Sequence, residues 1–166
     1  MIRARSALLV LLTLACARER PVQVDNSNLG IAATFPGEAK LLRWEETTPF
    51  GRMEWFDTIY APTARMDESF HIQVGNLPAG TQGGSSPAEV AATFQGWLQA
   101  RLGPIAATEL PAGKGPGFHY TAKGPNGRII EGVLVIRRAR LHHAQATVAR
   151  SDDPRLRAFI DSFQVQ

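Results

Sequence analysis

Residues 128–150, with the sequence RIIEGVLVIRRARLHHAQATVAR, decide the fold class of this 166-residue chain. Their β-branched and apolar side chains predict two strands, over residues 128–137 and 140–150. Only Arg138 and Ala139 separate the two, and a connection this short joins neighbouring strands that run antiparallel. The stretch therefore predicts an antiparallel sheet and not the parallel sheet of a doubly wound fold.

Further strands are expected upstream of this hairpin. The clearest lies at residues 69–74, where Phe70, Ile72 and Val74 alternate with polar side chains. Residues 76–85 contain Pro78 and three glycines, which is typical of a loop. The remaining strands are expected at residues 29–35, 40–47, 52–60, 105–110 and 117–123.

Two segments predict amphipathic helices. Ser86-Pro87-Ala88-Glu89 is a capping box with proline at the first helical position, and Gly103-Pro104 ends the helix that it begins. Asp153 and Pro154 begin a second helix near the C-terminus. The apolar residues expected to face inward are Val90, Phe94, Trp97, Leu98 and Leu102 in the first helix and Leu156, Phe159, Ile160 and Phe163 in the second. Four strands, a helix, four strands and a helix predict a single α+β domain, with helices packed on the faces of an antiparallel sheet.

Composition excludes several classes of function. Apolar residues make up 44% of the chain and charged residues 20%, which favours a packed core. Without Arg3 and Arg5, which lie in a segment that we expect to be cleaved, 16 basic residues face 15 acidic ones. A chain this close to neutral is poorly suited to nucleic acid, whose binding depends on many positive charges. The single cysteine, Cys16, excludes an internal disulfide and a cysteine-based zinc site.

The N-terminus has the features of a lipoprotein signal peptide at residues 1–15. Two arginines precede an apolar run, residues 7–15, that is shorter than the roughly 20 residues a membrane-spanning helix needs. Leu12-Thr13-Leu14-Ala15-Cys16 resembles a bacterial lipobox, although Thr13 stands where leucine is usual. The resemblance implies cleavage before Cys16, a diacylglycerol on its thiol, and an acyl chain such as palmitate on the new amino group.

An acylated Cys16 would anchor the protein to a membrane of the cell envelope, because several acyl chains hold firmly where one binds only marginally. Ala17 follows the cysteine, and no aspartate there indicates retention at the inner membrane. We therefore expect the periplasmic face of the outer membrane, or the cell surface. Residues 16–28 are expected to form a flexible tether and residues 29–166 the folded domain. Two alternatives stay open: an ordinary secretory signal with an incidental cysteine, and a membrane-spanning anchor.

Four short motifs resemble those of small PsbP-like and DcrB-like lipoproteins. They are Ala33-Thr34-Phe35-Pro36-Gly37-Glu38-Ala39, Thr47-Thr48-Pro49-Phe50-Gly51, Gly115-Pro116-Gly117-Phe118-His119 and Phe159-Ile160-Asp161-Ser162-Phe163. Phe118-His119 departs from the basic and acidic pair that is usual there. The resemblance covers nearly the whole mature domain and implies an antiparallel sheet with helices on both faces. It implies little about activity, because the fold hosts assembly factors, import adaptors and uncharacterised envelope lipoproteins.

Candidate catalytic and metal-binding residues are few. The histidines are His71, His119, His142 and His143, and the adjacent pair points to opposite faces of a strand, so it cannot share one metal ion. Ser86 is explained as a helix cap, because no GxSxG motif surrounds it. The glycines at residues 80–84 lack the GxxxxGK[ST] pattern of a phosphate-binding loop. We expect no enzymatic activity, no metal and no cofactor.

Two features remain as candidate binding sites. Arg137, Arg138 and Arg140 form a basic cluster, which is either a solvated turn or a contact for an anionic lipid surface or an acidic partner. The second is an aromatic group that belongs either to the core or to an apolar groove. Its members are Trp44, Trp55, Phe56 and Tyr60. 

These features together predict a non-catalytic cell-envelope lipoprotein. We expect it to reach the membrane through Cys16 and to bind, or assist the assembly of, an envelope protein partner. The alternative is a carrier of a small apolar ligand or lipid in a groove between the sheet and a helix.

Overall fold

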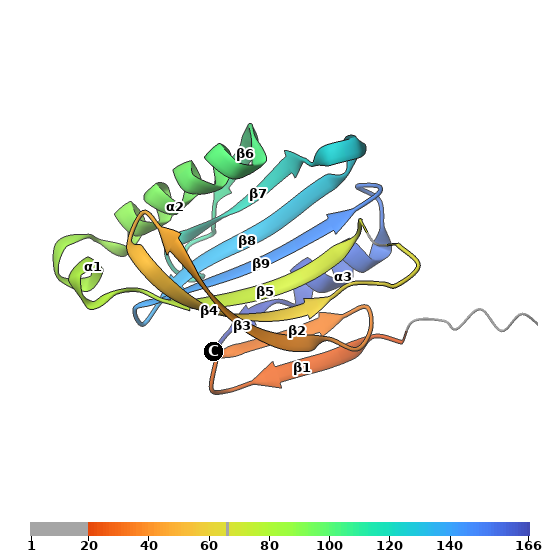
Figure 1. Cartoon of the computed structure of the whole chain (residues 1–166), viewed down its shortest axis with the longest axis horizontal. Helices are drawn as coiled ribbons and strands as arrows, with labels where there is room; N and C mark the ends of the chain where they lie inside the picture. Colours follow the sequence, from red (N-terminus) through yellow and green to blue (C-terminus); the bar gives the residue numbers. More distant parts are fainter. Residues whose placement is uncertain (1–19, 66) are drawn as a thin grey trace, which may run out of the picture.

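A seven-stranded antiparallel sheet forms the centre of the protein, shown in Figure 1. The computed structural model describes residues 20–65 and 67–166. The strand order is β3-β4-β5-β9-β8-β7-β6. The strands are β3 (Lys40–Thr48), β4 (Gly51–Tyr60), β5 (Ser69–Asn76), β6 (Ile105–Glu109), β7 (Gly117–Lys123), β8 (Ile129–Arg137) and β9 (Arg140–Val148). The deciding hairpin, β8–β9, lies near the middle of the sheet and turns through Arg138 and Ala139, both at positive φ (51° and 59°).

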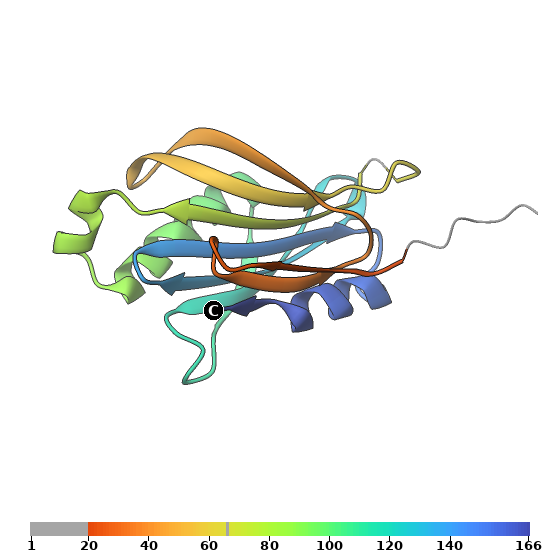
Figure 2. The ribbon, with the colours of Figure 1, turned by 90° about the horizontal axis from the view of Figure 1, so that it is seen from below.

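A second, three-stranded antiparallel sheet packs beside the first. It has the order β1-β2-β10, from β1 (Val22–Asn26), β2 (Ile31–Phe35) and β10 (Gln164–Val165). Because β10 follows the last helix, this sheet brings the two ends of the described chain together. Figure 2 shows it on the same side of the large sheet as α3 (Pro154–Ser162).

Helices cover both faces of the large sheet. On one face, α2 (Pro87–Leu102) begins at the predicted capping box and ends at Gly103 with φ of 81°. It buries Val90, Phe94 and Leu98 against Trp55, Tyr120 and Leu134. On the other face, α3 and β2 bury Phe35, Leu156 and Phe159 against Phe70, Ile72 and Ala144. The short α1 (Ala79–Gly84) and the 3₁₀ turn η1 (Pro125–Gly127) lie in connections.

The predicted α+β class, the antiparallel pairing and the helices on both faces are confirmed. Three expectations are wrong in detail. Residues 22–26 do not belong to a tether: they form β1, because the backbone of this polar segment pairs with β2 along its whole length. The first predicted strand lies in the small sheet instead of the large one, and the loop at residues 76–85 contains α1.

The domain has two distinct ends, the entry end and the turn end. The entry end is where the chain enters at Pro21, beside residues 61–65 and 149–153. The turn end carries Arg138 and Ala139 together with the β1–β2 connection, residues 27–30. The nine residues of β8 run between these ends, a length of about 30 Å at roughly 3.3 Å per residue. Figure 1 shows β1 beginning on the side opposite the β8–β9 turn.

The two aromatic rings of α2 differ in burial, which gives a test of the core. Phe94 is fully buried against Trp55, whereas Trp97 is half-buried and packs on Phe94 and Arg101. We expect Phe94→Ala to lower the free energy of unfolding by about 3–5 kcal/mol. Trp97→Ala should cost less, about 1–2 kcal/mol, because part of the ring is already exposed to water. Urea denaturation of both variants measures the difference, and equal losses would show that the two rings contribute alike.

Candidate functional site

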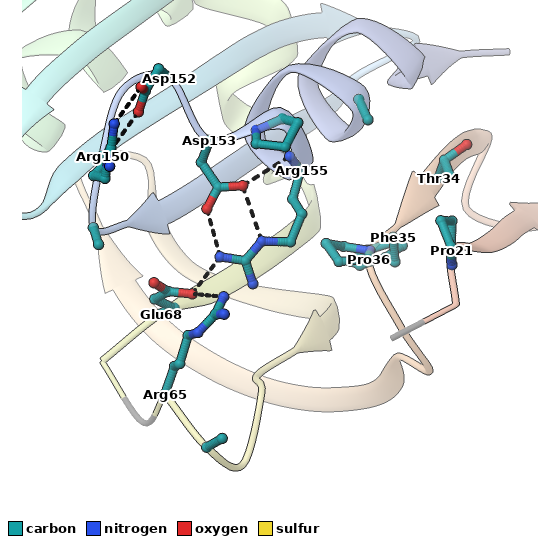
Figure 3. A pocket seen from close by; sticks show the side chains of 14 residues that line it. Pro21, Thr34, Phe35, Pro36, Arg65, Glu68, Arg150, Asp152, Asp153 and Arg155 are labelled. Carbon is teal, nitrogen blue, oxygen red and sulfur yellow. Dashed lines mark hydrogen bonds and ion pairs between the residues drawn. The ribbon is translucent and has the colours of Figure 1, made fainter. Parts of the chain in front are cut away.

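A solvent-open groove of about 1150 Å³ lies at the entry end, shown in Figure 3. Three parts of the fold form it: the chain entry with the end of β2, the β4–β5 connection, and the start of α3. Its exposed apolar lining comes from small side chains, namely Pro21, Ala64, Ala149, Pro154 and Ala158. Charged side chains line the remainder, so the groove combines an apolar surface with a polar wall.

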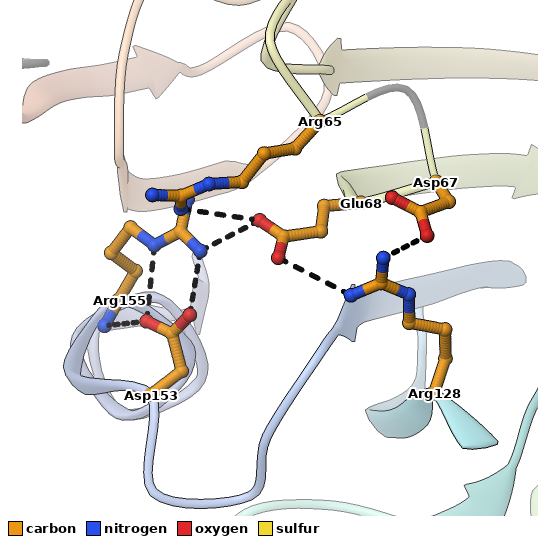
Figure 4. A network of polar contacts seen from close by, with 6 residues as sticks. All are labelled: Arg65, Asp67, Glu68, Arg128, Asp153 and Arg155. Atoms are coloured by element: carbon orange, nitrogen blue, oxygen red, sulfur yellow. Dashed lines mark hydrogen bonds and ion pairs between the residues drawn. The ribbon is translucent and has the colours of Figure 1, made fainter. Parts of the chain in front are cut away.

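The polar wall is organised around the buried carboxylate of Glu68, shown in Figure 4. Its side chain is only 3% exposed. Oε2 accepts a hydrogen bond from Arg155 Nη2 at 2.7 Å and lies 3.4 Å from Arg65 Nη1. Oε1 lies 3.5 Å from Arg128 Nη1. A carboxylate this buried needs such partners, because a lone buried charge is strongly destabilising.

Two further carboxylates complete the cluster. Asp153 is the N-cap of α3, where it accepts from the backbone N–H of Arg155 at 2.9 Å and pairs with the same guanidinium at 2.6 Å. The hydrogen bond from Arg155 holds the pKa of Asp153 below its usual range, and the reciprocal bond raises the pKa of Arg155. Asp67 pairs with Arg128. Three carboxylates and three guanidinium groups therefore satisfy one another, and the cluster joins three loops without leaving a net charge.

This internal balance determines what the groove can bind. Its buried charges already have partners, so it offers no strong attraction to an ion. The exposed prolines and alanines offer a shallow apolar surface that an extended peptide or a small apolar group could cover. At the rim, Arg150 and Asp152 pair with each other at 2.6 Å while both stay mostly exposed. They are the polar groups available to a bound partner.

Cys16, the predicted lipidation site, lies outside the described residues. Pro21, five residues further along the chain, lines the groove. Five extended residues reach at most about 17 Å. A lipid on Cys16 would therefore hold the groove close to a membrane surface.

The predicted basic cluster lies at the turn end. Arg137 Nη1 donates to the carbonyl of Val165 at 2.8 Å, and Arg140 Nη1 donates to the carbonyl of Asn28 at 2.9 Å. The two side chains therefore help to join the small sheet to the large one. Arg138 is exposed. None of the three lines the groove at the entry end.

The predicted aromatic group divides between the two faces of the sheet. Trp55 lies under α2, stacked on Trp44 with centroids 5.9 Å apart. Phe56 and Tyr60 face the opposite core. These rings act as core residues and do not line the groove.

A chain of hydrogen bonds crosses the sheet face under α2. Asp57 meets Nδ1 of His71 at 3.1 Å and accepts from Gln73 at 3.2 Å. Gln73 then contacts Nδ1 of His143 at 3.0 Å, whose Nε2 meets the Tyr120 hydroxyl at 2.8 Å. An aspartate beside a histidine is also half of a catalytic triad, but no hydroxyl or thiol is bonded to His71 in the part of the chain that the structure describes.

Burial determines the behaviour of this chain. It lowers the pKa of His143 to about 3 and raises that of Tyr120 far above its ordinary value. Neither group exchanges a proton near neutral pH, so both serve as fixed hydrogen-bond partners. Across residues 20–65 and 67–166, no three histidine, aspartate or glutamate side chains are placed to hold a metal ion. No helix in that same part of the chain is long and apolar enough to cross a membrane.

Sequence reasoning missed the central residue of the groove wall. Glu68 meets Arg128 and Arg155, which are 60 and 87 positions away, and no local pattern links residues that far apart. Glu131 was also missed: it is buried between His119 at 2.8 Å and Arg157 of α3 at 3.0 Å. One feature of the sequence could have identified Glu131: it is the only acidic residue in the apolar strand β8.

Comparison with known proteins supports the fold and nothing finer. No protein-family model and no curated protein sequence matches the chain. Among solved structures, it is similar to the solution structure of cyanobacterial PsbP (CyanoP) from Synechocystis sp. PCC 6803. The TM-score is 0.50 at 11% sequence identity, over 89% of this chain and 94% of that one. The PsbP-like fold is therefore confirmed, and the likeness covers the domain as a whole.

The Glu68 cluster is expected to stabilise the fold. We expect Glu68→Gln to lower the free energy of unfolding by about 2–4 kcal/mol, because it leaves three guanidinium groups without their shared carboxylate. The control is Glu45→Gln, which removes an exposed partner of Arg52 and should cost less than about 1 kcal/mol. Urea denaturation at pH 7 measures both. A loss for Glu68→Gln no larger than the control would show that the cluster does not stabilise the fold.

The buried position of His143 leads to a prediction of how the free energy of unfolding depends on pH. Its pKa in the folded protein, about 3, lies below its ordinary value of 6.5. Between these values the unfolded chain binds a proton that the folded protein does not, so stability falls as the pH falls, by about 1.4 kcal/mol per pH unit. We expect His143→Gln to remove the part of this slope that His143 contributes and to leave the part that comes from His142, whose pKa is also lowered by burial. His119→Gln, which changes a partly exposed ring, should keep the full slope. Unfolding free energies from pH 7 to pH 4 test this, and an unchanged slope in His143→Gln contradicts it.

Proposed function

We propose that this protein is a non-catalytic lipoprotein of the cell envelope whose entry-end groove binds an envelope protein partner. One observation carries the proposal: the groove opens beside Pro21, where the chain continues toward Cys16. The lone cysteine within a lipobox-like run supplies the anchor. The domain would sit at the periplasmic face of the outer membrane.

The corrected length of the tether strengthens this proposal. Because β1 begins at Val22, only the five residues 17–21 separate the acylated cysteine from the fold. A segment that short keeps the entry end within about 17 Å of the lipid-bearing residue. The groove then faces the membrane, where a membrane-embedded or membrane-bound protein is the available partner.

The chemistry of the groove favours a protein partner. Its small apolar side chains and its exposed Arg150–Asp152 pair match the mixture of apolar and polar groups typical of transient interfaces. A second candidate function, the carriage of a small apolar ligand, is favoured by the volume of about 1150 Å³, since ligand pockets usually hold about 300–1,000 Å³ and this groove is slightly larger. The groove is open to solvent, however, and the space between α2 and the sheet is filled by Phe94 and Leu98.

The polar groups of the sheet support the proposal that the protein is non-catalytic. His143 and Tyr120 are held neutral by burial and bonded on both sides. His71 is oriented by Asp57 but has no nucleophile bonded to it among the described residues. A general base needs such a partner within reach.

One experiment in living cells tests anchor and groove together. A photo-reactive amino acid at Ala158, in the groove, should cross-link to a defined membrane protein. The same amino acid at Ala107, an exposed position on the edge strand β6, is the matched control and should not. Cys16→Ser should release the protein from the membrane and reduce cross-linking at Ala158 at least several-fold.

Two outcomes count against the proposal. Cross-linking of the same partner from Ala107 would place the contact away from the groove. A mature protein that stays in the membrane fraction after Cys16→Ser, or that carries no acyl mass on Cys16, would remove the lipoprotein assignment. Intact-mass analysis of the extracted protein measures the acyl chains directly.

A further inference from the structure

A second cavity lies at the turn end, about 30 Å from the groove by the length of β8. Its volume is about 350 Å³. The hairpin contributes Arg137, Arg138, Arg140 and His142, and the β1–β2 connection contributes Leu29 and Gly30 on the facing side. The cavity is thus built where the two sheets meet.

The positive charges around this cavity are not neutralised by side-chain carboxylates. Arg137 donates to the carbonyl of Val165, and Arg140 donates to the carbonyl of Asn28 and to Oδ1 of Asn76 at 3.1 Å. These acceptors are neutral, so they orient the guanidinium groups without removing their charge. Within the described residues, none of the three arginines forms an ion pair with an acidic side chain, unlike those of the Glu68 cluster.

The chain end offsets this charge only in part. Gln166, the last residue, lines the same cavity with a main-chain oxygen beside Gly30. Even as a full carboxylate it balances one of three positive charges. The cavity therefore retains an excess of positive charge in a concave surface, where the field of the three arginines adds.

His142 adds a second, independent observation at the same cavity. The residue is 3% exposed, and no hydrogen bond reaches its Nδ1 from any described residue. Burial lowers the pKa of His142, and the charges of Arg140 and Arg137 act in the same direction. Hydrogen bonds between the ring and the backbone of Leu29 and Val135 act in the opposite direction. A buried polar atom without a partner is uncommon and costs stability. A bound anion would offset the effect of the two arginines on the ring, which lines the same cavity.

We propose that this cavity binds a compact oxyanion, a carboxylate, phosphate or sulfate group, between Arg138, Arg140 and His142. Guanidinium groups suit such ligands because their parallel N–H groups match two oxygens at once. The site is distinct from the groove and does not depend on the proposed function. A flat anionic membrane is not the ligand that the geometry favours, since the cavity lies at the end of the domain opposite Pro21, where an anchor on the preceding residues would be attached, and charges are screened over about 8 Å.

The test is a titration with sulfate, whose charge is constant between pH 5 and pH 8. Full-length protein in a neutral detergent is titrated at constant ionic strength against chloride, and NMR follows the arginine Nε–H groups and the ring nitrogens of His142. We expect saturable binding that shifts the His142 ring signals. Arg138→Gln removes a side chain that has no bond in the described fold, and it should weaken binding about tenfold, which corresponds to about 1.4 kcal/mol. His142→Gln should weaken it as well.

The matched control is Arg150→Gln, which removes the same charge at the entry end and should leave the sulfate affinity unchanged. An equal loss in Arg150→Gln, or sulfate shifts that leave the His142 ring unmoved, would show non-specific attraction and overturn the proposal. The source of the anion is tested in nanodiscs of neutral lipid with and without phosphatidylglycerol. Arg138-dependent shifts that appear only with the anionic lipid, and not with sulfate, would make the cluster a membrane contact and overturn the proposal too.

Discussion

The structure depends on one constraint: both faces of the seven-stranded sheet are apolar, so both must be covered. Phe70, Ile72 and Val74 face one side, while Trp55, Tyr120 and Leu134 face the other. The 16-residue α2 covers the second face. The nine residues of α3 are too few to cover the first, and the small sheet completes that layer with Ile31, Ala33 and Phe35. Burying this surface is what draws β1, β2 and β10 from opposite ends of the chain into one sheet.

That packing also determines where the two candidate sites lie. Since β1 pairs with β2, the chain enters the fold beside the end of β2 and the start of α3, where the groove opens. The β1–β2 connection then lies against the β8–β9 turn, where the basic cavity forms. Both sites are thus by-products of attaching the small sheet to the large one. Each lies at an edge of that contact, where loops from distant parts of the sequence meet.

Local patterns in the sequence predicted what depends on local physics. Alternation predicted β5 and the β8–β9 hairpin, and the capping box predicted the first residue of α2. The opposite orientations of His142 and His143 also follow from the strand alone. Local patterns failed where strand pairing or contacts between distant residues determine the structure. The sequence of β1, VQVDN, is polar and does not predict a strand, and α1 contains three glycines, which do not predict a helix. The Glu68 cluster could not be predicted, because its arginines come from two separate connections and from the first turn of α3.

The two adjacent histidines show how a structural polar group differs from one that awaits a ligand. His143 is bonded through both ring nitrogens, to Gln73 and to Tyr120, and the hydroxyl of Tyr120 fits only because residue 132 is glycine. A Cβ on Gly132 would lie 2.7 Å from that hydroxyl oxygen. Both ring nitrogens therefore have partners, and burial keeps His143 and Tyr120 neutral. His142, on the other face, is equally buried, lines a cavity with three cationic side chains, and has an Nδ1 without a partner among the described residues. The same residue type at successive positions thus fills a core on one side of the sheet and leaves an unmet hydrogen-bonding need on the other, and only the second arrangement gains from a bound anion.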